Sequence, residues 1–260
     1  MDMTDARTWH GMESQSESQL ELQSPSIADG IPGFRDAEAP QVFLLETARG
    51  AMKNNNYLVV DPVTHQAVAI DPAWQPDVFA EALAATRATL SEILVTHTHD
   101  DHIDLAIPLS EHYNCPIRMS REEIAWSGFE ATRLLPLDGG PWQVGAMAIE
   151  PILTPGHTPG CVCYRIGDNL FTGDVLFAEG CGICFELDAA YRMYDSLQDL
   201  KQRLAPHTHV FPGHTYVRPP GQRFAELMRC NIYLQFSDRE SFAAYRLRKG
   251  QIGRKVLDFK

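Results

Sequence analysis

A dense cluster of histidine and aspartate directly after a short apolar run constrains this chain more than any other feature of its sequence. The run 93–95 (Ile-Leu-Val) is typical of a buried strand, and the pattern H-x-H-x-D-H follows it with His97, His99, Asp101 and His102. Imidazole nitrogen and carboxylate oxygen are ligands that zinc and iron accept. A strand end that aims such side chains into one cleft predicts a metal site. A solvated polar loop is the competing interpretation.

Three further side chains of the same chemical kind follow downstream, each next to glycine or proline. His157 lies in Pro-Gly-His-Thr-Pro-Gly, Asp174 in Thr-Gly-Asp, and His214 in Pro-Gly-His. Isolated histidines are usually ordinary surface or core residues. Three ligand-type residues at expected strand ends, together with the earlier cluster, favour one shared metal-binding site.

Apolar and amphipathic stretches alternate after residue 40 and predict a layered α/β domain over residues 41–260, with a helical C-terminal part. Expected strands cover 42–45, 56–60, 67–70, 93–96, 142–153, 161–166, 169–173 and 209–211. Expected helices cover 77–86, 103–113, 121–128, 188–204 and 223–249. Residues 1–40 are rich in Ser, Gln, Glu and Asp, so they are expected to form a disordered polar extension.

Composition excludes several classes of protein. The chain of 260 residues is 44% hydrophobic, which suits a globular core, and it has no apolar run near the roughly 20 residues needed to span a bilayer. Because its beginning is polar and acidic, we expect a cytoplasmic protein with reduced, structural cysteines and no membrane contact. A net charge of −12 argues against nucleic acid as a partner.

Charge is unevenly distributed along the chain. Residues 201–260 hold 12 Lys and Arg against 4 Asp and Glu, a net charge of +8, although the whole chain is acidic. This basic part indicates an anionic partner near the C-terminus, or else an ordinary solvated helix face.

The full motif series over about residues 42–216 resembles the signature of the metallo-β-lactamase superfamily. That resemblance implies an αββα sandwich, in which two mixed sheets are flanked by helices. It also implies two metal ions, expected to be Zn²⁺, although iron or manganese accepts the same ligands. Carried over to this sequence, the resemblance assigns the first ion to His97, His99 and His157, the second to Asp101, His102 and His214, a bridging position to Asp174, and support of the metal loop to Asp71.

Within the superfamily, the chain resembles the glyoxalase II branch, but Ile183 stands where that branch has an arginine. Segments 181–184, 193–197, 212–216, 231–233 and 246–260 look most similar to the zinc-dependent hydrolases of bacterial trans-acyltransferase polyketide pathways. This resemblance implies hydrolysis of acyl thioesters on an acyl carrier protein or another phosphopantetheine thioester. Hydroxide generated by the metals would attack the carbonyl, and Asp101 would accept or relay the proton.

The resemblance and the basic C-terminal part together suggest residues that bind the substrate. Tyr216 follows His214 by two residues and is expected to flank the substrate, with ordinary packing as its alternative. Arg246, Arg248 and Lys249 are expected to bind a phosphate, or else to complement a helix end.

Three other functions stay open from the sequence. One is a glyoxalase II-type hydroxyacylglutathione hydrolase. Another is a mononuclear iron persulfide dioxygenase that uses His97, His157 and Asp174. The last is a non-catalytic binding protein on the same fold, against which the complete set of ligands argues.

Overall fold

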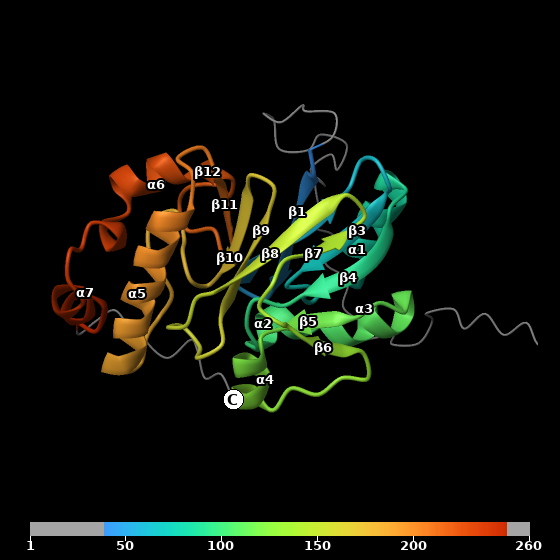
Figure 1. Ribbon diagram of the computed structural model, residues 1–260. Helices are drawn as coiled ribbons and strands as arrows, with labels where there is room; N and C mark the ends of the chain where they lie inside the picture. The colour runs from blue at the N-terminus through green and yellow to red at the C-terminus, as the bar shows by residue number, and fades with distance from the viewer. Residues whose placement is uncertain (1–38, 249–260) are drawn as a thin grey trace, which may run out of the picture.

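Two six-stranded mixed sheets packed face to face form the protein, and helices cover the outer face of each (Figure 1). The computed structural model describes residues 39–248. The expected extension 1–40, apart from its last two residues, and Lys249 lie outside this range. The arrangement confirms the predicted αββα sandwich.

The first sheet has the strand order β1-β2-β3-β4-β5-β6. Strands β1 to β3 pair antiparallel, and β3 to β6 pair parallel. The bounds of its strands are β1 Gln41–Arg49, β2 Met52–Val60, β3 Gln66–Ile70, β4 Thr89–Leu94, β5 Ile117–Met119 and β6 Leu134–Pro136.

The second sheet has the order β12-β11-β10-β9-β8-β7. Only β10 and β11 pair parallel; its other neighbours pair antiparallel. The bounds of its strands are β7 Trp142–Val144, β8 Met147–Leu153, β9 Val162–Ile166, β10 Asn169–Gly173, β11 His209–Pro212 and β12 Gln222–Arg223.

Helices α1 and α3 pack on the first sheet, α5 and α6 pack on the second, and α7 packs on the outer side of α5 (Figure 1). None of the helices within residues 39–248 is long and apolar enough to cross a bilayer. The helices are α1 Pro76–Thr86, α2 Asp100–Ile103, α3 Ala106–Tyr113, α4 Arg121–Ser127, α5 Leu187–Arg203, α6 Phe224–Cys230, the 3₁₀ helix Ile232–Leu234 and α7 Arg239–Arg246.

Side chains that alternate along each strand hold these layers together. In β2, Tyr57 and Val59 face the second sheet, while Leu58 and Val60 face α1 and α3. This period of two places apolar groups on both faces, as a strand covered on both sides requires. Between the sheets, Phe171 stacks on Phe211 with ring centroids 5.2 Å apart.

The structure corrects several predicted boundaries. The segments 103–113 and 142–153 are each divided, the first into α2 and α3 and the second into β7 and β8 around Gly145. The expected helix 223–249 is three short helices within the described residues. Strands β5, β6 and β12 were not predicted because each has only two or three residues, too few to show a hydrophobic period.

Candidate metal centre

The predicted ligands come together where several strands end at one edge of the sandwich. His97 follows β4, Asp174 follows β10, and His214 follows β11, while His157 lies in the loop between β8 and β9. Rigid strands therefore fix the points from which flexible side chains start. The structure brings together all seven side chains that the sequence singled out as ligands.

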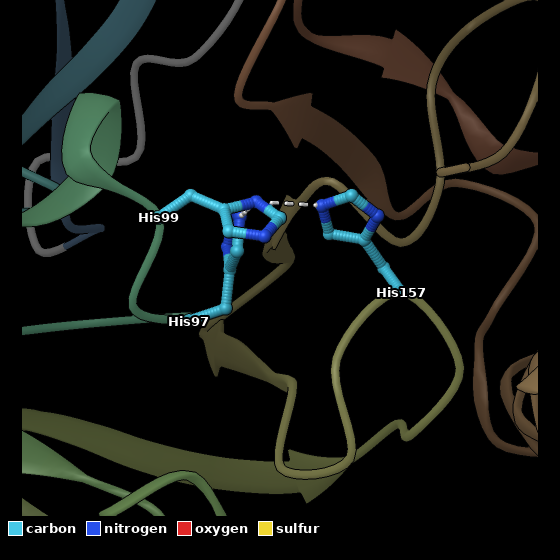
Figure 2. A group of neighbouring side chains, drawn as sticks. All are labelled: His97, His99 and His157. Carbon is cyan, nitrogen blue, oxygen red and sulfur yellow. Dashed lines mark hydrogen bonds between the residues drawn. The ribbon is translucent and has the colours of Figure 1, made fainter. Parts of the chain in front are cut away.

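Three ring nitrogens converge to form the first cluster. His97 Nε2 lies 3.1 Å from His99 Nδ1, which in turn lies 3.0 Å from His157 Nε2. Figure 2 shows the rings of His99 and His157 facing each other across the gap between their two loops. Such a triad of imidazoles offers the number and kind of protein ligands that a catalytic zinc accepts.

Asp101, His102 and His214 form a second cluster, and Asp174 lies between the two clusters. Asp174 Oδ1 is 3.5 Å from His102 Nε2 and 3.4 Å from His214 Nε2. Its other oxygen, Oδ2, is 3.6 Å from His157 Nε2 in the first cluster. One carboxylate thus presents an oxygen to each group of ligands, as the bridging role expected of Asp174 requires.

Hydrogen bonds on the opposite ring nitrogen orient four of these histidines. The Nδ1 atoms of His97, His102, His157 and His214 bond, respectively, to Thr96 Oγ1, Asp71 Oδ2, the Ile183 carbonyl and the Lys53 carbonyl at 2.9–3.0 Å. Each of these bonds favours the tautomer that leaves the Nε2 lone pair pointing into the site, the usual arrangement of a metal-bound histidine.

Asp71, which the resemblance assigned to support of the metal loop, lies beside Thr96 and His102. Its carboxylate accepts hydrogen bonds from Thr96 N at 2.7 Å, Thr96 Oγ1 at 2.6 Å and His102 Nδ1 at 2.9 Å. Its backbone has a φ of +49°, a conformation that costs a non-glycine residue free energy and often occurs at functional sites. The three bonds offset this cost and hold the metal loop.

Buried atoms with unused bonding capacity show that the cluster fits a cation. Both His102 Nε2 and Asp174 Oδ1 are buried, and neither has a hydrogen-bond partner within the described residues. Leaving such polar atoms unpaired in a protein interior is unfavourable. Gly213 leaves the space they need, because a Cβ there would lie 2.6 Å from His102 Cε1 and 2.8 Å from Asp174 Oδ1. A divalent cation would satisfy both atoms.

The histidines of the two clusters differ in the direction of their pKa shifts. Burial lowers the pKa of His97 and His157 and brings the pKa of His99 to about 4, so the first cluster is neutral at pH 7. Burial acts in the same direction on His102 and His214, but Asp174 together with Asp71 at His102, and together with the Lys53 carbonyl at His214, raises the pKa of both above the ordinary value. Protons therefore compete little with a metal ion at the first cluster, and they compete more strongly with it for His102 and His214 at the second.

A pocket of about 650 Å³ opens directly onto both clusters. Tyr216 lies in its wall with 65% of its surface exposed, and Arg246 reaches the wall from α7 while 6% exposed. The Nε of Arg246 donates to the Gly182 carbonyl at 2.7 Å. Arg248, in contrast, folds back over the ring of Tyr245.

Sequence reasoning missed two residues that support the ligands. Asn54, in β2, donates from Nδ2 to Asp101 Oδ2 at 3.2 Å. Glu123, in α4, accepts hydrogen bonds from two of the loops that carry histidines. The polar run 54–56 inside an otherwise apolar strand was a signal for Asn54. Glu123 gave none, because a glutamate in a short helix is typical of a solvated face.

Comparisons with known proteins agree with this site. The model of the metallo-beta-lactamase superfamily matches residues 39–214. The probable polyketide biosynthesis zinc-dependent hydrolase BaeB of Bacillus velezensis is 40% identical over 215 residues, covering 82% of this chain and 96% of BaeB. A hydroxyacylglutathione hydrolase of Rhizobium etli is 38% identical over 180 residues, covering 67% and 65% of the two chains.

A solved structure, ETHE1 from Myxococcus xanthus, is 30% identical and superimposes with a TM-score of 0.69, covering 78% of this chain and 89% of that one. The matched residues 39–214 run from the start of β1 to His214 and contain every ligand of both clusters. The chain therefore belongs to the metallo-beta-lactamase superfamily.

Proposed function

We propose that this protein is a di-zinc hydrolase that cleaves acyl thioesters carried by an acyl carrier protein or another phosphopantetheine arm. The observation that carries the proposal is the complete second cluster, joined to the first by Asp174 and open to the 650 Å³ pocket. The similarity to BaeB, named a probable polyketide biosynthesis zinc-dependent hydrolase, supports the same class of reaction.

Each residue of the site has a distinct task in this reaction. Bound divalent cations would supply Lewis acidity and lower the pKa of water to about 7. Asp101 Oδ2 lies at the pocket wall, 3.4 Å from His214 Nε2, and would accept the proton that the attacking water loses. Asn54 holds that oxygen in place, and Asp174 keeps the two groups of ligands together.

The pocket wall suits a long arm with an anionic end. Tyr216 packs edge-on against Phe177, with ring centroids 5.2 Å apart, and offers an apolar face beside the metal centre. Arg246 supplies a buried cation farther along the wall, and an arginine binds phosphate well. Of the other two residues expected to bind phosphate, Arg248 lies over the Tyr245 ring, and Lys249 lies outside the described residues.

A glyoxalase II-type reaction on a glutathione thioester is the second candidate. It is favoured by the similarity to the Rhizobium etli enzyme, which is named a hydroxyacylglutathione hydrolase. The third candidate, a mononuclear iron dioxygenase, would leave Asp101, His102 and His214 without a role. Those side chains, like the members of the first cluster, offer ligand atoms within 4.8 Å of one another, and this supports the proposal of two ions.

Metal content and a panel of substrates test the proposal. The protein is purified without added metal, its zinc and iron are counted, and it is assayed on acetyl-carrier protein, acetyl-pantetheine and lactoylglutathione. About two zinc ions per chain and highest kcat/KM on the carrier protein are expected. A preference for lactoylglutathione would support the second candidate. One iron with oxygen consumption on a persulfide would refute the hydrolase.

A further inference from the structure

Glu123 is a fully buried carboxylate that none of the proposed chemistry uses. It lies in α4 and its side chain has 0% exposure. A charged side chain is rarely buried to this extent unless its oxygens are satisfied by partners. Its partners therefore indicate what it does.

Both oxygens of Glu123 bind loops that carry ligands of the first cluster. Oε1 accepts from Thr98 N at 2.8 Å and from Thr98 Oγ1 at 2.7 Å. Oε2 accepts from Thr158 Oγ1 at 2.6 Å and from Gly160 N at 3.1 Å. Thr98 lies between His97 and His99, and Thr158 directly follows His157. One carboxylate thus links the two loops that must meet for these three histidines to converge.

The start of α4 is built to approach the second of these loops closely. Ser120 caps the helix by accepting from Glu123 N at 3.0 Å, and it donates to the Gly160 carbonyl at 2.5 Å. At Gly160, a Cβ would lie 2.0 Å from Glu123 N, so only glycine allows this approach. The contact between the start of α4 and the loop of Gly160 therefore depends on close backbone packing as well as on the charge of Glu123.

Other groups hold the second cluster. Asn54 bonds to Asp101, Asp71 to His102, and the Lys53 carbonyl to His214. Within residues 39–248, the Glu123 carboxylate forms no hydrogen bond to any of these ligands. A change at Glu123 should therefore act mainly on one cluster.

We propose that Glu123 is a positioning residue that sets the affinity of the first metal site independently of the second. Its four accepted hydrogen bonds fix the separation between the loop of His97 and His99 and the loop of His157. Groups that orient metal ligands typically change metal affinity ten- to a hundred-fold when they are replaced. This role does not depend on which substrate the site hydrolyses.

Replacing Glu123 with glutamine tests whether the hydrogen bonds of the carboxylate, and not the size of the side chain, set the metal affinity. The amide keeps the size of the side chain, but its NH₂ group has to face donors from one of the two loops. We expect the affinity of the apoprotein for the first Zn²⁺ site to fall about ten- to a hundred-fold, while the second site changes less than threefold. Titration against a competing chelator measures both constants, and the visible spectrum of the Co²⁺ form should change at the first site.

Glu92→Gln is the matched control. Glu92 is also a buried carboxylate, but it accepts from Arg118 and Trp142, away from the ligands. This variant should lose stability and keep both metal affinities. A drop in Tm of similar size in both variants, with metal affinity lost only in Glu123→Gln, would exclude a general structural effect.

Thr158 provides a second test in case Glu123→Gln does not fold. Thr158→Val removes one of the four donors and should weaken the first site, whereas Thr158→Ser keeps the hydroxyl and should restore it. Unchanged first-site affinity in folded Glu123→Gln or Thr158→Val would overturn the proposal. Equal weakening of both sites, or equal loss in Glu92→Gln, would overturn it as well.

Discussion

Replacing Asp71 with asparagine should damage the second metal site through the tautomer of one histidine. Asp71 Oδ2 accepts the proton of His102 Nδ1 at 2.9 Å, which leaves His102 Nε2 as a lone pair. An amide NH₂ at this position donates instead, so it favours the tautomer with the proton on Nε2. That proton would point at Asp174, where the lone pair is needed for a cation.

The hydrogen bonds that Asp71 accepts determine how much stability the Asp71→Asn variant should lose. Asparagine has one carbonyl oxygen in place of two carboxylate oxygens, so it loses either the bond from Thr96 N or the two bonds at the Oδ2 position. A bond to a charged acceptor contributes about 1.5–3 kcal/mol, so the free energy of unfolding should fall by at least about 1.5 kcal/mol. Affinity for the second Zn²⁺ should fall about ten- to a hundred-fold, equivalent to about 1.4–2.7 kcal/mol. Urea unfolding of the apoprotein measures the first quantity, and competitive Zn²⁺ titration measures the second.

Asp61→Asn is the control for this experiment. Asp61 is a buried carboxylate in the turn after β2, where it accepts from Val63 N, Thr64 Oγ1 and Ala146 N, remote from the ligands. It should lose comparable stability and bind both ions normally. Wild-type affinity for both ions in Asp71→Asn would refute the reasoning, and so would an equal loss of affinity in Asp61→Asn.

Three further predictions follow from the geometry of the site and the burial of its groups. His214→Ala removes one of three ligands from the second cluster, so metal analysis after dialysis should find about one ion fewer per chain; an unchanged count would contradict the assignment. Because the pKa of His102 is raised and that of His99 is about 4, affinity at the second site should rise with pH through neutrality while the first site stays nearly constant. Calorimetry in buffers of different ionisation enthalpy should find most released protons at the second site, and equal release from both would be inconsistent with these shifts. Burial raises the pKa of Cys163 to about 12, whereas Cys230 is exposed, so iodoacetamide at pH 7.5 should modify Cys230 first and mass spectrometry should locate the label there; early modification of Cys163 would show that the core opens.

The candidate metal ligands could be predicted from sequence because each lies in a short motif that can be recognised without knowledge of the fold. All seven lie either within the H-x-H-x-D-H pattern directly after an apolar strand or directly after a glycine, and strand ends place such side chains at one edge of a sheet. The apolar runs 56–60 and 67–70 likewise predicted strands, which the structure has as part of β2 and as most of β3. The superfamily resemblance then supplied the pairing of ligands into two groups.

The short strands and the supporting residues could not be predicted in the same way. β5 and β6 have three residues each, and their hydrogen bonds come from neighbouring strands rather than from their own sequence. Arg246 stood out in the sequence as a charge, but only the packing of α7 shows that its Nε is bound to the Gly182 carbonyl.

Local chemistry in the sequence indicated the fold class and the candidate metal ligands, because residue type, spacing and hydrophobic period are properties of short segments. Tertiary structure decided which nitrogen of His102, His157 and His214 faces the site, that Asp174 lies between the two clusters, and that Glu123 binds two loops at once. These features depend on contacts between residues that lie 25 to 161 positions apart, such as those from Thr98 to Glu123 and from Lys53 to His214. Such contacts exist only once the two sheets have packed and brought their loops to one edge.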